Sequence, residues 1–85
     1  MSAPMRAKFV INSIERNGTA EWQSEKLKMS AVAKSDKYPN DGSDEDNTYA
    51  KFSPQAELSL TIANPALIGQ FNPGEKFYVD FTPVA

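Results

Sequence analysis

The sequence predicts an all-β or mainly β fold: a small antiparallel barrel or sandwich of about five strands, with one short helix before the last strand. Apolar and polar residues alternate with period two in several separate segments, which is typical of half-buried strands. Turn-forming residues separate these segments at short intervals, as in small antiparallel barrels and sandwiches. A chain of 85 residues provides for one domain, so we expect residues 1–85 to fold as a single unit.

The first two strands are expected over residues 5–14 and 25–34. Val10 and Ile14 fall on the opposite parity from the other apolar residues of the first segment. The dipeptide Asn17-Gly18 tolerates positive φ and favours a turn between the segments, which together predict an antiparallel hairpin. The apolar residues that share one parity are Met5, Ala7, Phe9 and Ile11 in the first segment, and Leu27, Met29, Ala31 and Ala33 in the second.

Three further strands and a short helix complete the expected fold. A strand over residues 48–53 ends at a proline, and a strand over residues 56–62 alternates without exception. The dipeptide Asn64-Pro65 has the residue types of a helix N-cap and first helical position, and it predicts about one helical turn. A Pro-Gly turn precedes the last strand, residues 76–82. The expected core comprises Phe9, Ile11, Leu27, Met29, Leu58, Leu60, Ile62, Leu67, Phe77, Val79 and Phe81.

The chain lacks the residues on which many catalytic sites depend. It contains no histidine and no cysteine, which excludes Ser-His-Asp and Cys-His catalysis as well as histidine and thiolate metal sites. Its four glycines form no phosphate-binding motif. We therefore expect a protein that is not an enzyme and that uses no cofactor.

Residues 35–47 form a polar loop that is rich in carboxylates. Carboxylates suggest calcium, but the EF-hand spacing fails, because Gly42 at the sixth position would place Lys37 first and Pro39 third. We expect a flexible or partner-ordered surface and no metal site. Long loops are often functional, so four carboxylates are candidate partner-binding groups: Asp41, Asp44, Glu45 and Asp46.

Charge is distributed unevenly, with six basic and three acidic groups in residues 1–35, and three basic and eight acidic groups in residues 36–85. If the first two strands pair, five of the cations lie on one exposed face of the hairpin. Such a face can bind an acidic protein surface or nucleic-acid phosphates, or its only effect can be to oppose edge-to-edge aggregation. Trp22 and Tyr78 are the aromatic residues available for stacking on single-stranded nucleic acid. The net charge of −2 favours a protein partner. The five cations of this face, whose positions alternate with the expected core positions of the hairpin, are Arg6, Lys8, Lys26, Lys28 and Lys34.

Two stretches are distinctive: residues 34–48, KSDKYPNDGSDEDNT, and residues 63–83, ANPALIGQFNPGEKFYVDFTP. At these stretches, which cover less than half of the chain, the sequence resembles a family of very short, mostly uncharacterised proteins encoded by tailed bacteriophages. The resemblance implies a viral origin and a virion-associated or host-modulating role. It carries over no site residue.

We therefore expect a structural or interaction protein that docks on a larger phage assembly, such as a head surface, through its sheet faces and the 35–47 loop. The alternatives are a nucleic-acid-binding accessory protein that uses the basic hairpin face, and an inhibitor of a host protein. The sequence has no apolar segment of a secretory signal and no run long enough to span a membrane. We expect it in the bacterial host cytoplasm or the virion, without a membrane partner, and the sequence leaves its oligomeric state open.

Overall fold

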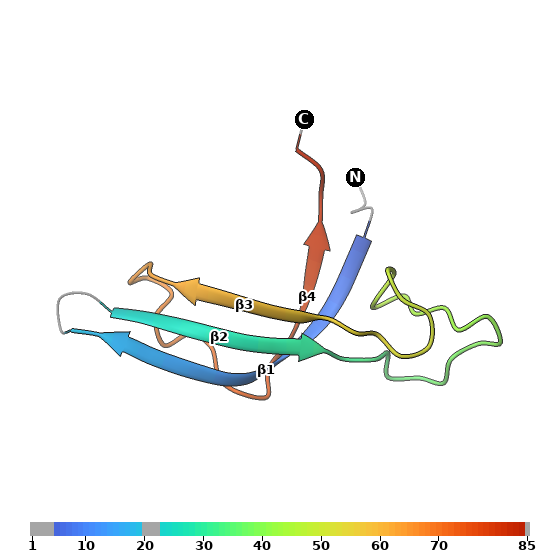
Figure 1. Ribbon diagram of the computed structural model, residues 1–85, viewed down its shortest axis with the longest axis horizontal. Coiled ribbons are helices and arrows are strands. Elements are labelled where there is room, and N and C mark those ends of the chain that lie inside the picture. Colours follow the sequence, from blue (N-terminus) through green and yellow to red (C-terminus); the bar gives the residue numbers. More distant parts are fainter. Residues whose placement is uncertain (1–4, 20–22, 85) are drawn as a thin grey trace.

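Four β-strands form one antiparallel sheet in the computed structural model, which describes residues 5–19 and 23–84. The all-β fold class is therefore confirmed. The predicted five-stranded barrel or sandwich with a helix is not confirmed, because the described residues contain no helix and the outer strands of the sheet do not pair with each other. The strands are β1 (Met5–Gly18), β2 (Gln23–Ala31), β3 (Glu57–Ile62) and β4 (Lys76–Phe81), in the order β3-β2-β1-β4 (Figure 1).

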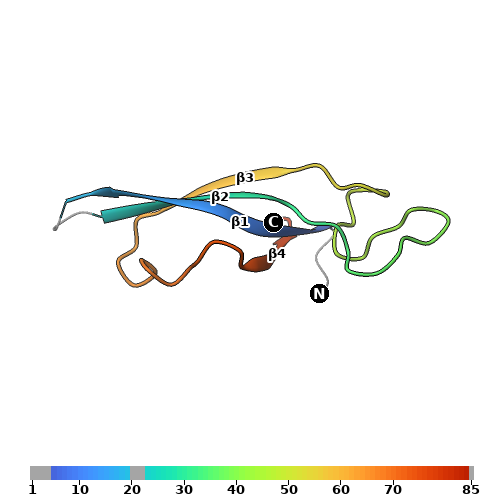
Figure 2. The same ribbon diagram turned by 90° about the horizontal axis from the view of Figure 1, so that it is seen from below.

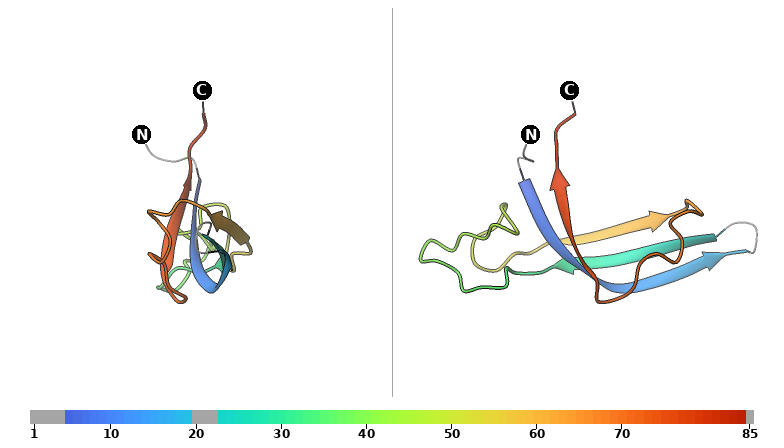
Figure 3. Two further views of the ribbon diagram at one scale, coloured as in Figure 1. Left: turned by 90° about the vertical axis from the view of Figure 1, so that its left-hand side faces the viewer. Right: turned by 180° about the vertical axis from the view of Figure 1, so that it is seen from behind.

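Strand β1 organises the sheet, since its second half pairs with β2 and its first half pairs with β4. Phe9 and Val10 pair with β2 on one side and with β4 on the other. Figure 1 and the right-hand view of Figure 3 show that β1 bends, so that its first half and β4 leave the direction of β2 and β3 together. The predicted hairpin is confirmed, but the turn predicted at Asn17-Gly18 is wrong, because both residues belong to β1 and pair with Ser24 and Gln23 of β2.

A β-bulge at Asn12 changes which residues of β1 face the core. The register of β1 against β2 shifts between Ile11 and Ser13. Because side chains alternate along a strand, one extra residue transfers the apolar side from odd to even positions. Ile14, which breaks the alternation in the sequence, therefore packs against the same core as Ile11.

The core lies on one face of the sheet, and the segment between β3 and β4, residues 63–75, runs along that side in Figure 2. Ile68 and Phe71 of this segment pack against the core, and the rings of Phe71 and Phe77 meet edge to face with their centroids 5.5 Å apart. All of the buried apolar residues except Ala7 belong to the predicted core. The buried apolar residues are Ala7, Phe9, Ile11, Leu27, Met29 and Ile62.

The core prediction is wrong for Leu60, Leu67 and Phe81, which are exposed. Leu60 lies opposite Leu27 and has the predicted parity, but β3 is an edge strand and 49% of Leu60 stays exposed. Phe81 ends the other edge strand and is 46% exposed. Parity therefore identifies the face of a strand correctly but does not tell how far that face is covered. Three predicted core residues are partly buried: Leu58, Phe77 and Val79.

The predicted strand over residues 48–53 is absent, and this segment forms turns instead. Ala50 donates its N–H to the carbonyl of Asn47 at 3.0 Å, and Phe52 has a φ of 61°, a left-handed conformation that strands do not adopt. The two aromatic residues that suggested a strand, Tyr49 and Phe52, are three residues apart and so do not share a face under period two.

The predicted helix after Asn64 is a pair of hydrogen-bonded turns. Asn64 caps the first turn as expected, since its Oδ1 accepts a backbone N–H two residues later at 3.0 Å. The backbone bonds then join residues three apart, from Leu67 to Asn64 and from Gln70 to Leu67. Gly69 ends the segment, because it has a φ of 82° and donates its N–H to the side chain of Glu25.

Candidate functional site

The chain that follows β2 lies along the first half of β1. Val32 donates its N–H to the carbonyl of Lys8, and Thr48 donates its N–H to the carbonyl of Arg6, both at 2.9 Å. Arg6 returns a hydrogen bond from its N–H to Thr48 Oγ1 at 2.8 Å. These residues therefore satisfy the backbone groups of β1 on the side opposite β4, where a further strand would otherwise be needed.

The side chain of Asn47 joins these contacts and is completely buried. Its Oδ1 accepts the N–H of Lys8 at 2.9 Å, and its Nδ2 donates to the carbonyl of Val32 at 2.7 Å. A side-chain amide carries the donor and the acceptor of a peptide bond. Asn47 therefore supplies the hydrogen bonds that a neighbouring strand would supply.

Asp44 holds Asn47 in place. This buried carboxylate accepts the side-chain amide of Asn47 at 3.2 Å and the backbone N–H groups of Lys34, Asp46 and Asn47 at 2.9 to 3.2 Å. Burial is the largest single influence on the pKa of Asp44 and acts to raise it, but the four donors together outweigh burial and lower the pKa. The loop is thus tied to the sheet through a carboxylate that accepts four hydrogen bonds, at a place where the sequence predicts a flexible or partner-ordered surface.

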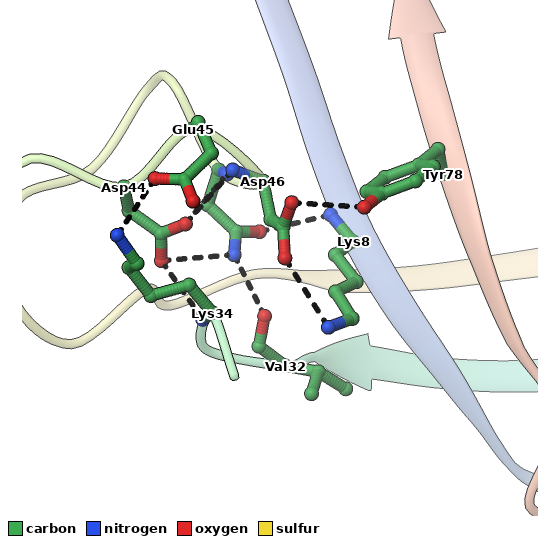
Figure 4. A network of polar contacts seen from close by, with 8 residues as sticks. Lys8, Val32, Lys34, Asp44, Glu45, Asp46 and Tyr78 are labelled. Carbon is green, nitrogen blue, oxygen red and sulfur yellow. Dashed lines mark hydrogen bonds and ion pairs between the residues drawn. The ribbon is translucent and has the colours of Figure 1, made fainter. Parts of the chain in front are cut away.

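Charged groups lie around Asp44, as Figure 4 shows. Lys8 Nζ lies 3.2 Å from Asp46 Oδ2, and both side chains are largely buried. The hydroxyl of Tyr78 donates to Asp46 Oδ1 at 2.9 Å, and this hydrogen bond raises the pKa of Tyr78. Lys34 Nζ bonds to Glu45 at 2.8 Å on the other side of the network.

Arg6 extends the network across the outer face of the sheet. Its Nε and Nη2 groups donate to the two carboxylate oxygens of Asp80 at 2.7 and 3.2 Å, which lowers the pKa of Asp80. The Arg6 guanidinium also lies 4.5 Å from the centre of the Tyr78 ring, within the range of a cation–π interaction. A bidentate pair of this kind fixes geometry as well as charge.

Seven of the eleven candidate residues therefore converge on one network: Arg6, Lys8, Lys34, Asp44, Glu45, Asp46 and Tyr78. Lys26 and Lys28 lie apart on β2, where Lys28 Nζ bonds to Glu15 at 2.7 Å. Asp41 remains in the loop and accepts a backbone N–H two residues later at 3.0 Å. Trp22 lies outside the described residues.

The cations predicted to form a basic face are largely neutralised by neighbouring carboxylates. Lys34 follows the end of β2 and is not on the sheet. Arg6, Lys8, Lys28 and Lys34 each form an ion pair with a carboxylate. Binding of a polyanion would have to compete with these pairs, which reduces the favourable electrostatic term. The basic hairpin and the acidic loop thus contact each other.

Sequence reasoning does not single out Glu25, which is buried on the core face of β2. Its Oε1 accepts the N–H of Gly69 at 2.9 Å, and its Oε2 lies 2.6 Å from Arg16 Nε. The hydrogen bond from Gly69 lowers the pKa of Glu25, burial opposes the shift, and Arg16 adds to it. The available sequence signal is parity, because Glu25 shares the apolar side of its strand with Leu27.

An apolar groove of about 320 Å³ opens between the start of β3 and the end of β4. The first half of β1 contributes to its lining, and the polar residues along it are Gln55 and Glu57. Six of its apolar side chains come from three strands and from the segment that follows the 35–47 loop: Met5, Phe9, Tyr49, Leu58, Val79 and Phe81.

Within residues 5–19 and 23–84, no three histidine, cysteine, aspartate or glutamate side chains are grouped so that they could hold a metal ion. The same described ranges contain no helix that is long and apolar enough to cross a membrane.

The chain matches no protein-family model, no curated protein and no solved structure. Its function must therefore be inferred from its own surfaces and contacts.

Proposed function

We propose that this chain is a non-enzymatic interaction protein that docks on a larger assembly, and that the apolar groove between β3 and β4 is its docking surface. The observation that carries the proposal is the exposure of large apolar side chains along this groove, among them Phe81 and Tyr49. Contiguous exposed apolar surface on a small soluble domain marks an interaction site. Covering it removes apolar area from water at about 25 cal/mol per Å², which favours association.

The size of the exposed surface supports the same proposal. The accessible surface is 6135 Å², whereas a compact monomer of 9.4 kDa has about 5,000 Å². The radius of gyration is 15.3 Å, against about 12 Å for a compact domain of 85 residues. An open, bent sheet leaves apolar area that a closed barrel would bury, and a partner surface would supply the missing cover.

A phage particle is the assembly to test first, on the resemblance of residues 34–48 and 63–83 to short phage proteins. A host protein that the chain inhibits would use the same groove. Nucleic-acid binding, the alternative from another class, has less support, because Arg6, Lys8 and Lys28 are already paired with carboxylates.

Particle association tests the proposal. Wild type, Phe81→Asp and the control Val84→Asp, an exposed position beyond β4, would each be produced in phage-infected cells, and the particles would be separated on a density gradient. Mass spectrometry should find wild type and Val84→Asp in the particle fraction, while Phe81→Asp remains with the free protein. Circular dichroism of the purified variants checks that each is folded.

Two results would contradict the docking proposal. The first is that all three proteins remain outside the particle fraction. The second is submicromolar binding of wild type to DNA at about 150 mM salt that is lost in Lys26→Ala/Lys28→Ala, which would favour the nucleic-acid alternative.

A further inference from the structure

The outer edge of β4 carries backbone groups that β1 does not use. Ile11 donates its N–H to the carbonyl of Glu75 at 2.9 Å, which sets the alternation of the β1–β4 ladder, so that the odd residues of β4 bond to β1. In an antiparallel ladder, the backbone N–H and carbonyl groups of the residues between them point away from the partner strand. Lys76, Tyr78 and Asp80 therefore direct their N–H and carbonyl groups toward the open edge.

The sequence of β4 is complementary to itself when two copies run antiparallel. A two-fold axis at Tyr78 places Lys76 of each copy opposite Asp80 of the other on the outer face. The same register places Phe77 opposite Val79 on the core face. Opposite charges and pairs of an aromatic with a β-branched residue are cross-strand neighbours that stabilise a sheet. The three residues whose backbone groups point toward the open edge then all form hydrogen-bonded pairs with the second copy.

We propose that a second copy of this chain pairs with the edge of β4, and that the two form a symmetric dimer with one continuous sheet from β3 of one copy to β3 of the other. Such an interface is isologous, since the same residues serve both partners, and strand addition to an open edge is an established mode of recognition. The inference goes beyond docking on an assembly and does not depend on it.

The exposed area of the whole chain is large enough to supply an interface of ordinary size. The accessible surface exceeds that of a compact monomer by about 1,100 Å², from 6135 Å² and about 5,000 Å². Each partner in a standard interface buries about 800 Å². Phe81, which is exposed at the end of β4, lies three residues from the proposed axis and continues the apolar row of Phe77 and Val79.

The charges favour β4 over the other open edge, β3. An axis at Ser59 of β3 would place Glu57 opposite Thr61, so no charge pair would form. In β4, Lys76 forms no ion pair with any described residue, so it can approach Asp80 of the second copy, which would then contact Lys76 as well as Arg6 of its own chain. Natural edge strands are often blocked by a proline or a bulge, and the pairing of β4 with β1 has neither.

Sedimentation equilibrium of the purified full chain, over about 1 to 200 µM, tests the dimer. Wild type should approach twice 9.4 kDa as its concentration rises. In a homodimer of either Lys76→Glu or Asp80→Lys, positions 76 and 80 carry charges of the same sign at both symmetry-related contacts. Each variant should therefore weaken self-association about tenfold or more. An equimolar mixture restores opposite charges at both positions, so it should associate to within about threefold of wild type.

Two controls keep the test decisive. Glu57→Lys, a charge reversal on the β3 edge, should leave association unchanged. Lys76→Arg keeps the charge and should associate like wild type, which provides a comparison that does not disturb the Arg6–Asp80 pair if Asp80→Lys fails to fold.

The dimer is rejected if wild type stays at 9.4 kDa throughout the series, or if Lys76→Glu associates as wild type does. Loss of association in Glu57→Lys with Lys76→Glu unaffected would place the contact at β3 and also reject it. A monomer that still joins particles would reject the dimer alone, and a dimer that never joins them would reject the docking function alone.

Discussion

Replacing Asn47 with alanine tests whether the 35–47 loop is part of the cooperative fold. The change removes the acceptor of the Lys8 N–H and the donor to the Val32 carbonyl, at a position with no solvent exposure. A buried group left without a partner costs about 1–3 kcal/mol, so two such groups should lower the free energy of unfolding by about 2–6 kcal/mol. For a domain of this size the melting temperature should then fall by at least about 8 °C.

Thermal and urea unfolding followed by circular dichroism measure this effect. Asn40→Ala is the matched control, because Asn40 is exposed in the same loop, and it should stay within about 0.5 kcal/mol of wild type. Asn47→Asp is a second probe, since it keeps an oxygen for Lys8 but loses both N–H donors and faces the carboxylate of Asp44. Equal unfolding free energies for wild type and Asn47→Ala would show that water replaces the lost partners and would refute the structural role of Asn47.

Two further measurements concern the core and the buried carboxylates. Leu27→Ala should lower the free energy of unfolding by about 2–5 kcal/mol, and Leu60→Ala, at the exposed cross-strand partner, by about 1 kcal/mol; equal costs in urea unfolding would contradict the exposure of β3. Folding lowers the pKa values of Glu25 and Asp44, so their stabilisation is present above their ordinary values of 4.5 and 3.8 and is lost as the pH falls through the folded values. Urea unfolding should therefore show stability that declines below about pH 5 and declines less in Glu25→Gln, whereas a rise in stability on acidification would contradict this.

Alternation of apolar residues predicts most of the sheet, because one face of each strand is turned toward the core. The predicted strands over residues 56–62 and 76–82 differ from β3 and β4 by one residue at one end. The prediction is less accurate for β1, where the bulge at Asn12 moves the apolar side to even positions. A reader of the sequence sees Ile14 as an exception, although it marks the place where the register changes.

The helix and the strand that were predicted incorrectly share a physical cause. In both places, side chains make the hydrogen bonds that backbone groups were expected to make. The N–H of Gly69, which a helix would use, goes to Glu25, 44 residues away in the chain. Asn47, which directly precedes the strand predicted over residues 48–53, supplies a strand-like hydrogen bond to Lys8, 39 residues away. Local propensity and periodicity describe near neighbours in sequence and carry no information on contacts of this range.

The charge pattern has a similar explanation. An excess of cations in the first part of the chain and of carboxylates in the second suggests two separate binding surfaces, but Lys8 meets Asp46 and Lys34 meets Glu45 when the chain folds. The opposite charges of the two parts thereby hold the loop to the sheet. The fold also leaves an apolar surface and a strand edge uncovered, namely the groove that ends at Phe81 and the outer edge of β4. Recognition by this protein should therefore respond more to apolar and edge-strand substitutions than to removal of its lysines, except at Lys76, which lies on the β4 edge and forms no ion pair among the described residues.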